Sequence, residues 1–198
     1  MPKIGAEPER RQSLIDAALL TIGEQGSLDV SVREIARRAG MSPALAFHYF
    51  GDKDEIVTQT MRHLLREFSG EVRSHLASAR SPRQRLAAIV RASFARSQFE
   101  RTTIAAWLVF YLHSYSAMTA GRLLQVYSRR LGSNLMAALT VLQDREQAAV
   151  TAESIASMID GLYVRHALRR EGPDGAEAVA ICLQYLDDRL GADDNGQD

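Results

Sequence analysis

The stretch SVREIARRAGMSPALAFHYFGDK, residues 31–53, decides how the chain folds. Ser31, with a glutamate three positions later, forms a capping box that starts a short helix, which we expect to end near Gly40. Ser42 followed by Pro43 starts a second short helix only two residues after that glycine. Two short helices joined by a tight turn with glycine form a helix-turn-helix, whose second helix enters the major groove of DNA. The stretch therefore predicts a DNA-binding motif.

The outward face of the second helix points to the same partner. Pro43, Ala44, Phe47 and His48 lie at i, i+1, i+4 and i+5, which puts them on one side of that helix. Folding explains an exposed phenylalanine beside a histidine poorly, whereas methyl groups and rings contact thymine methyls, and His48 can donate to a phosphate or a base. The alternative is an ordinary two-helix corner with an incidental aromatic residue. The caps, the turn and the small residues together favour double-stranded DNA.

Phosphate contacts should flank the recognition helix, because they position a protein on DNA while base contacts specify the sequence. The first motif helix begins with a hydroxyl and two backbone amides, and a tyrosine and a lysine lie at the far end of the recognition helix. Two arginines open the chain's first helix. A solvated helix face explains any one arginine taken alone, but together these groups bracket one helix. The flanking candidates are Arg10, Arg11, Ser31, Val32, Arg33, Tyr49 and Lys53.

Apolar residues recur at helical spacing along nearly the whole chain, and no alternating β pattern or internal repeat appears. We expect an all-α fold of about nine helices. A helix-turn-helix domain should cover 1–55, with its motif at about 31–50. A ligand-binding and dimerisation domain should cover 56–190, followed by a disordered acidic tail at 191–198. The expected helices lie at about 9–25, 31–39, 42–50, 52–79, 81–99, 102–115, 120–141, 145–170 and 175–190.

Charge is balanced overall and uneven along the chain, with 24 basic and 24 acidic residues. The net charge is −2 over 1–61, +9 over 62–130 and −7 over 131–198. Solvated helix faces explain this pattern, although the acidic third could also meet the basic helices within or between chains. Cys182 is the only cysteine, the N-terminus has no apolar signal core, and the longest apolar run covers only 104–112. We expect a soluble cytoplasmic protein without a membrane segment.

The motif region resembles the tetracycline-repressor (TetR) family of regulators. SVREIARRAGMSPALAFHYFGDKDEI is similar to the family pattern T-x-R-x-I-A-x-x-A-G-V-S-x-x-x-L-Y-x-H-F-x-x-K-x-x-L, and the resemblance extends over 9–66. It implies a homodimeric, all-helical repressor with a C-terminal ligand-binding domain. It also implies DNA-backbone contacts by Ser31, Ser42, Tyr49 and Lys53. Phe47 stands where the family usually has tyrosine, so one hydroxyl is missing.

The second half of the chain offers a candidate site for a small molecule. The segment IAAWLVFYLHSY places Trp107, Phe110, Tyr111 and Tyr115 on one stripe of a helix. A packed core face is the usual reason for such a stripe, but ring faces of Trp and Tyr also bind quaternary ammonium groups. Tyr163 on a later helix could add a ring. Asp160 could add a carboxylate, although a structural role suits it better.

Segments spread over almost the whole chain resemble a narrower, choline-responsive branch of the TetR family. They are MPKIG, RRQSLIDA, HYFGDK, AWLVFY, RLLQVYSRRLGSNLM and IDGLYVRHAL. The resemblance implies that choline releases the repressor from operators of choline uptake and glycine-betaine synthesis genes. A repressor of an efflux or catabolic operon that senses another hydrophobic or cationic molecule is the alternative.

An enzyme is the contrasting class of function, and the residues do not favour it. The five histidines show no metal-ligand spacing, and no glycine-rich phosphate loop follows a strand. We therefore expect no catalytic residue, no metal and no cofactor.

Two apolar stripes near the C-terminus predict how two chains pair. Two helices from each chain, at 145–170 and 175–190, would form a symmetric four-helix bundle. The alternative is that both stripes are buried inside one chain. We also expect the fourth helix, which runs from the motif towards the ligand domain, to couple effector binding to DNA release. The stripe residues are Ile155, Met158, Ile159, Leu162, Val179, Cys182, Leu183 and Leu186.

Overall fold

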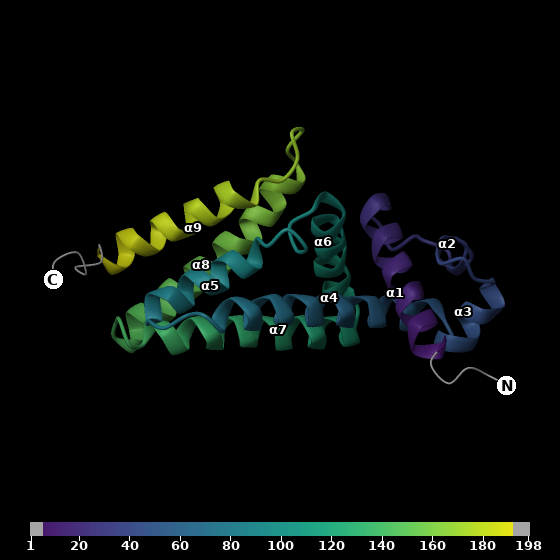
Figure 1. The fold of residues 1–198 in the computed structure, drawn as a ribbon, viewed down its shortest axis with the longest axis horizontal. Coiled ribbons are helices and arrows are strands. Elements are labelled where there is room, and N and C mark those ends of the chain that lie inside the picture. The colour runs from purple at the N-terminus through teal and green to yellow at the C-terminus, as the bar shows by residue number, and fades with distance from the viewer. Residues whose placement is uncertain (1–5, 192–198) are drawn as a thin grey trace. The chain divides into compact units, whose positions relative to one another are not determined.

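The computed structural model describes residues 6–191, and this part of the chain is entirely helical apart from turns and loops (Figure 1). The predicted all-α fold and its nine helices are confirmed over these residues. The segment MPKIG, on which part of the family resemblance rests, and most of the predicted disordered tail lie outside the described residues. The helices are α1 Ala6–Gln25, α2 Val32–Arg38, α3 Pro43–Phe50, α4 Lys53–Leu76, α5 Pro82–Ser93, α6 Arg101–Ser116, α7 Met118–Leu139, α8 Arg145–Ala167 and α9 Gly175–Leu190.

The chain forms two compact units. Unit 1 contains the residues up to Arg66 together with Arg101–Leu124, and unit 2 contains Glu67–Glu100 and the residues from Gln125 onward. This division differs from the boundary that we expected between residues 55 and 56. Helix α6 and the first turns of α4 belong to the same unit as the helix-turn-helix.

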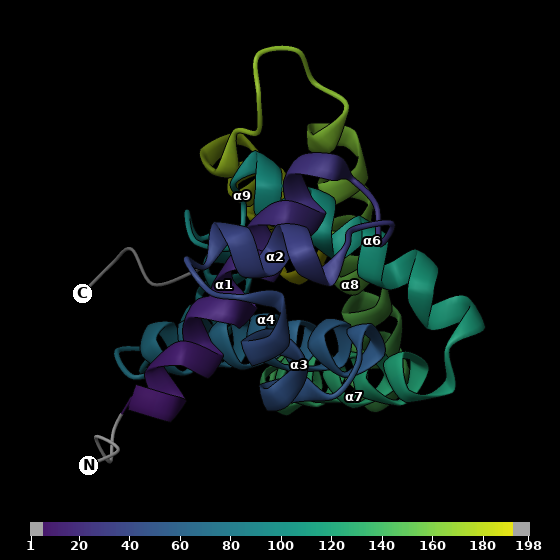
Figure 2. The same cartoon turned by 90° about the vertical axis from the view of Figure 1, so that its right-hand side faces the viewer.

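Unit 1 is built on a close packing of α6 against α1 (Figures 1 and 2). A Cβ atom added to Gly23 of α1 would lie 2.2 Å from the backbone oxygen of Thr102 at the start of α6. Only a glycine therefore allows the two backbones to approach this closely. Leu14 and Ile22 of α1 and Ile104 of α6 are fully buried in the same unit, and they stabilise this packing by removing apolar surface from water.

Unit 2 contains α5, α8 and α9, and its C-terminal helix is fixed at both ends. Before α9, the Asp174 amide donates to Nδ1 of His166 at 3.0 Å. At the other end, the Arg83 guanidinium of α5 donates to the carbonyl oxygens of Leu190 and Gly191, at the helix end where backbone acceptors have no partner within the helix. Arg83 also lies 3.7 Å from an Asp187 carboxylate oxygen, so one basic helix does meet the acidic C-terminal third.

Helix α5 is shorter than we expected from the sequence. It ends at Ser93 rather than near Phe99, and residues 94–100 form a series of turns and bends. Phe94 and Phe99 are both buried in this irregular segment, and their ring centroids lie 5.0 Å apart. The segment contains neither glycine nor proline, so no local residue signals the end of the helix.

We predict that Gly23→Ala destabilises the protein, because the new methyl group must displace backbone rather than a flexible side chain. The loss should be about 1–3 kcal/mol, as for other overpacked sites. Gly70→Ala is the matched control, since no atom lies within 4 Å of a Cβ at that helical position. It should stabilise the protein by about 1 kcal/mol. Urea unfolding of both variants measures the difference, and equal stability would argue against a tight α1–α6 contact.

Candidate nucleic-acid interface and effector site

The helix-turn-helix geometry follows from its caps. Helix α2 ends in a Schellman arrangement, in which Gly40 adopts φ +67° and the Met41 amide donates to the Ala36 oxygen at 2.8 Å. Ser42 then caps α3, with Pro43 in its first turn, as predicted. These caps explain why the second helix starts so abruptly after the first.

The predicted outward face of α3 is indeed at the surface. Ala44, Phe47 and His48 are exposed, Pro43 is half-buried, and Phe47 as a whole residue is 48% exposed. Ala46 of the same helix is fully buried in unit 1. Helix α3 therefore presents Phe47 and His48 outward, while the Ala46 side chain packs inward.

The two motif serines serve as helix caps and still have a hydrogen to donate. The Ser31 hydroxyl oxygen accepts from the Glu34 amide at 3.1 Å, and the Ser42 oxygen accepts from the Leu45 amide at 3.2 Å. Since capping uses only the oxygen, each O–H can donate to a phosphate. The predicted capping box is half formed, because Gln25 of α1 rather than the Ser31 backbone donates to the Glu34 carboxylate, at 2.7 Å.

Arg11 is exposed and lies beside the rings at the end of α3. Its guanidinium carbon lies 5.7 Å from the centroid of the Tyr49 ring and 5.3 Å from that of Phe50, and its Nε lies 3.3 Å from Glu7. These contacts hold the guanidinium against the C-terminal end of α3. Arg11 therefore positions Tyr49, a predicted phosphate contact, whereas Arg10 is exposed on α1.

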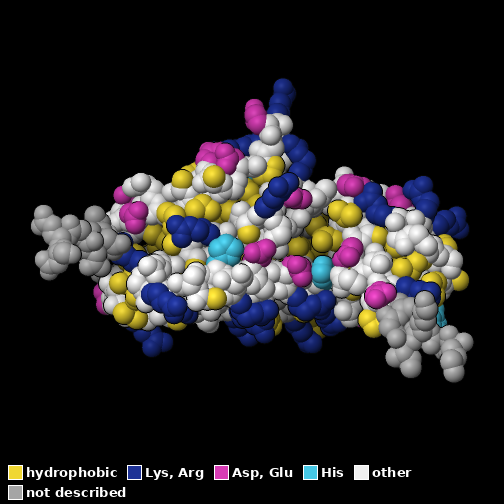
Figure 3. All heavy atoms as spheres, viewed as in Figure 1, with side chains coloured by type: hydrophobic (Ala, Val, Ile, Leu, Met, Phe, Trp, Pro, Cys, Tyr) yellow, Lys and Arg dark blue, Asp and Glu magenta, His cyan; other side chains and the backbone are white. Residues whose placement is uncertain are grey.

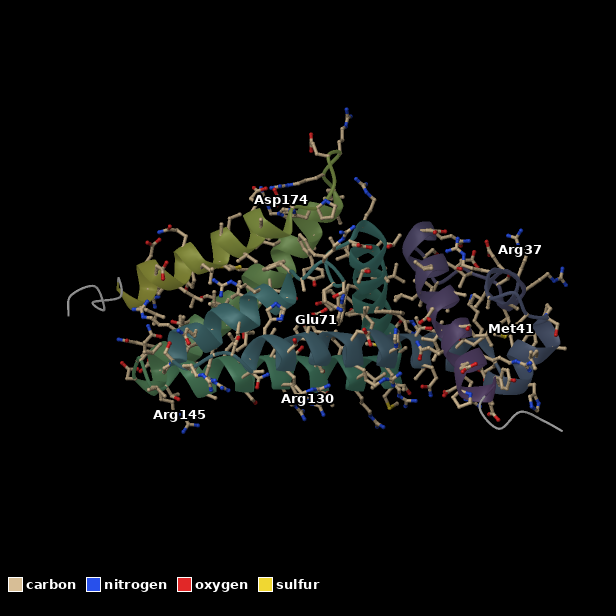
Figure 4. The ribbon with its side chains drawn as sticks, in the orientation of Figure 1. Arg37, Met41, Glu71, Arg130, Arg145 and Asp174 are labelled. Atoms are coloured by element: carbon tan, nitrogen blue, oxygen red, sulfur yellow. The ribbon has the colours of Figure 1, made fainter. Side chains whose placement is uncertain are left out.

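Helix α2 presents a basic face that the sequence reasoning used only in part. Arg33 and Arg37 are exposed and, among the described residues, neither forms an ion pair, and Arg37 lies at the outer surface of α2 (Figure 4). Arg38 instead bonds to Glu24 of α1, and this hydrogen bond lowers the pKa of the Glu24 carboxyl. The i, i+4 spacing of Arg33 and Arg37 could have revealed this face.

Two of the predicted phosphate contacts remain. The Val32 side chain is buried, which leaves its backbone amide as the candidate group. Lys53 is the first residue of α4 and is half-buried.

Three of the five predicted effector residues lie on α6 in unit 1. Trp107 and Phe110 are almost fully buried, and the Trp107 and Tyr111 rings lie 5.8 Å apart at an interplanar angle of 52°. Tyr115, the fourth aromatic residue of the predicted stripe, is 94% exposed. The stripe therefore divides into a buried part and one ring in solvent.

The other two, Asp160 and Tyr163, lie on α8 in unit 2. Tyr163 is buried in a ring cluster with Phe94, Phe99 and His166, and its hydroxyl donates to the Ser93 backbone oxygen at 2.6 Å. Burial is the main cause that raises the pKa of Tyr163 well above its usual value. Asp160 is exposed. The Tyr163 hydroxyl is thus already bonded within the chain, and its ring, 4% exposed, is packed against Phe94 and Phe99.

The structure corrects the residues that we assigned to the dimer interface. Five of the eight side chains are buried within unit 2 of a single chain: Ile155, Ile159, Leu162, Cys182 and Leu186. Burial also raises the pKa of the Cys182 thiol to about 12. The period of an apolar stripe cannot distinguish a core face from an interface face, because both exclude water. Met158, Val179 and Leu183 are half-buried.

The opposite faces of α8 and α9 remain open. On α8, Val150, Ser157, Gly161 and Val164 are exposed and carry no charge, and so is Leu168, which caps the end of the helix. On α9, Ile181 is 40% exposed, and Figure 3 shows hydrophobic side chains along that helix. These residues, rather than the buried stripes, are available to a second chain.

No described helix is both long and apolar enough to span a bilayer. Within residues 6–191, no three His, Cys, Asp or Glu side chains gather in a way that could hold a metal ion.

Two family models match the chain. Residues 14–60 match the model described as "Bacterial regulatory proteins, tetR family", and residues 82–191 match "BetI-type transcriptional repressor, C-terminal". The first covers the helix-turn-helix, and the second covers more than half of the chain.

Relatives match over almost their full length. An HTH-type transcriptional regulator BetI of Brucella anthropi is 53% identical over 186 residues, which cover 94% of this chain and 96% of that protein. A BetI of Agrobacterium fabrum is 49% identical over 197 residues, covering 100% and 96%. Both are named as regulators of transcription, not as enzymes.

Solved structures show the same fold. A putative regulator from Pseudomonas aeruginosa has a TM-score of 0.73 at 26% identity and covers 93% of this chain and 92% of its own. A putative regulator from Saccharomonospora viridis in complex with choline has a TM-score of 0.78 at 18% identity, covering 91% and 96%. The chain therefore belongs to the TetR family of bacterial regulators, as a BetI-type transcriptional repressor.

Proposed function

We propose that this repressor acts as a homodimer on a pseudo-palindromic operator of choline uptake and glycine-betaine synthesis genes, and that choline releases it. The observation that carries the proposal is the match of the whole C-terminal region to BetI-type repressors. The choline complex of a regulator with the same fold supports the choice of effector.

Helix α3 is the proposed reader of the operator. Phe47, His48 and Ala44 face outward to contact base edges, while Pro43 stiffens the first turn. The proposed phosphate contacts flank them. They are Arg10, Ser31, the amides of Val32 and Arg33, the exposed Arg37, Ser42, Tyr49 held by Arg11, and Lys53.

The proposed effector contacts in unit 1 are the rings of Trp107, Phe110 and Tyr111, and Tyr163 and Asp160 of unit 2 are separate candidates. Ring faces attract a trimethylammonium group through their negative quadrupole, most strongly for tryptophan. Because α6 packs directly on α1, a displacement of α6 by the effector would reach the DNA-reading helices within unit 1. This route adds to the coupling expected through α4.

Lys53→Ala should weaken binding to all DNA sequences about equally. It should lower the slope of log K against log salt by about one unit, because the variant leaves one phosphate without its cationic partner. Phe47→Leu should instead change which sequences bind, because it alters a base-facing side chain. Fluorescence anisotropy with operator and scrambled DNA, at about 50 to 200 mM salt, separates the two effects. A changed sequence preference in Lys53→Ala with an intact salt slope would reverse the assigned roles.

Gly161→Glu should convert the dimer into monomers, because it places a charge in the middle of the uncharged face of α8. The chain itself should fold normally, since no atom lies within 4 Å of a Cβ at this position. Gly132→Glu is the matched control: its helical site is equally open but lies on α7, outside the proposed interface. Sedimentation equilibrium at micromolar concentration gives the answer. If Gly161→Glu dimerises as tightly as the wild type, this face of α8 is not the dimer interface.

Trp107→Leu should leave operator binding intact and abolish release by choline, because leucine keeps most of the apolar volume but has no ring face. Tyr115→Leu on the same helix is the control, and its release by choline should be normal. Anisotropy with labelled operator during titration with choline, and separately with tetraphenylphosphonium, measures release. If only the bulky apolar cation released wild-type protein, the efflux-type alternative would replace the choline proposal.

A further inference from the structure

Unit 2 buries two polar groups that lack hydrogen-bond partners among the described residues. They are the amide oxygen Oε1 of Gln98 and the ring nitrogen Nε2 of His166, and each residue is only 1% exposed. An unpaired buried group carries a desolvation penalty, so each one needs a reason. His166 has a structural role through its other nitrogen, which accepts from the Asp174 amide in front of α9. Gln98 has no such role.

Gln98 lies in the irregular segment between α5 and α6, and its surroundings are unusual. Its backbone amide donates to the Ala95 oxygen at 2.8 Å, which fixes the turn. On one side, the Ser97 hydroxyl donates to a Glu71 carboxylate oxygen at 2.5 Å. On the other side, Phe99 enters the ring cluster with Tyr163, at 5.0 Å between ring centroids. Glu71, labelled in Figure 4, lies on α4 and is half-buried, and its other carboxylate oxygen lies 3.8 Å from Nδ1 of His75.

Three consecutive residues thus carry three chemical groups, the first at the surface and the other two buried. Ser97 holds a carboxylate, Gln98 supplies a free hydrogen-bond acceptor, and Phe99 supplies aromatic surface. A small amino alcohol with a trimethylammonium group fits this set. Rings and a carboxylate attract the cation, and an acceptor takes the hydroxyl hydrogen.

We propose that the Gln98 amide oxygen accepts the hydroxyl hydrogen of choline and thereby makes the repressor specific for the alcohol. The proposal rests on choline being the effector. The oxidised forms of the same molecule, an aldehyde and a carboxylate, have no hydrogen to donate to this oxygen. They would leave it unpaired, and a site with an unpaired polar group rejects such analogues strongly. The repressor would then respond to the substrate of an oxidation pathway and ignore its products.

Calorimetric titration of the full-length protein tests this with three ligands. They are choline, ethyltrimethylammonium, which is choline without its hydroxyl, and trimethylglycine, which carries a carboxylate. Wild type should bind choline about 10- to 100-fold more tightly than ethyltrimethylammonium, as expected for a hydrogen bond to a buried acceptor. Trimethylglycine should bind more weakly still.

Gln98→Met keeps the shape of the side chain and removes the acceptor. It should reduce the preference for choline to within about threefold while leaving the affinity for ethyltrimethylammonium unchanged. Gln98→Glu, which keeps an acceptor at the same place, should retain the preference. Gln125→Met, at an exposed glutamine of α7, is the control and should behave as wild type.

The outcomes separate this inference from the proposed function. If wild type binds choline and ethyltrimethylammonium equally, the cation is recognised but the hydroxyl is not, and the role of Gln98 is refuted. An equal loss of affinity for both cations in Gln98→Met would show a structural role and refute it too, as would tighter binding of trimethylglycine than of choline. If wild type binds neither cation, choline is not the effector, and both proposals fall.

Discussion

The contact between α1 and α6 at Gly23 and Thr102 is the constraint on which unit 1 depends. The two backbones are so close that no side chain fits between them, and backbone cannot move aside as a flexible side chain can. Helix α6 therefore lies in one compact unit with the helix-turn-helix. Any change in α6 must either move α1 with it or open this contact. That makes α6 a physical link between the proposed effector contacts and the DNA-reading helices, which a flexible linker could not provide.

The DNA-reading helices themselves are held by short-range chemistry. Side-chain caps at Ser31 and Ser42 and the glycine turn at Gly40 set the angle between α2 and α3. The Arg38–Glu24 ion pair ties α2 to α1, and the Arg11 guanidinium lies over the rings at the end of α3. Three helices of this size bury little apolar surface by themselves, so these polar ties and the packing of α6 complete the unit.

Features with a local cause could be predicted from the sequence, and those with a distant cause could not. The cap at Ser42, the start of α9 and the exposed face of α3 each depend on a few neighbouring residues, and the structure has them where we expected. The end of α5 at Ser93 depends instead on the burial of Phe94 and Phe99 against Tyr163, about seventy positions away. The apolar stripe that contains Ile155 and Ile159 does form a buried face of its helix. Periodicity alone, however, does not show whether the same chain or a second chain covers such a face. The unpaired oxygen of Gln98 likewise appears only when the packing around it is known.

Our central claim is that choline and operator DNA affect each other through this linked unit, so their binding must be reciprocal. The most direct test measures the affinity of choline for the free repressor and for the repressor saturated with operator. We expect operator to weaken choline binding by about 5- to 150-fold, which is the typical range for such coupling, and by the same factor by which choline weakens operator binding. Equal affinities of choline for the free and operator-bound protein would contradict the claim.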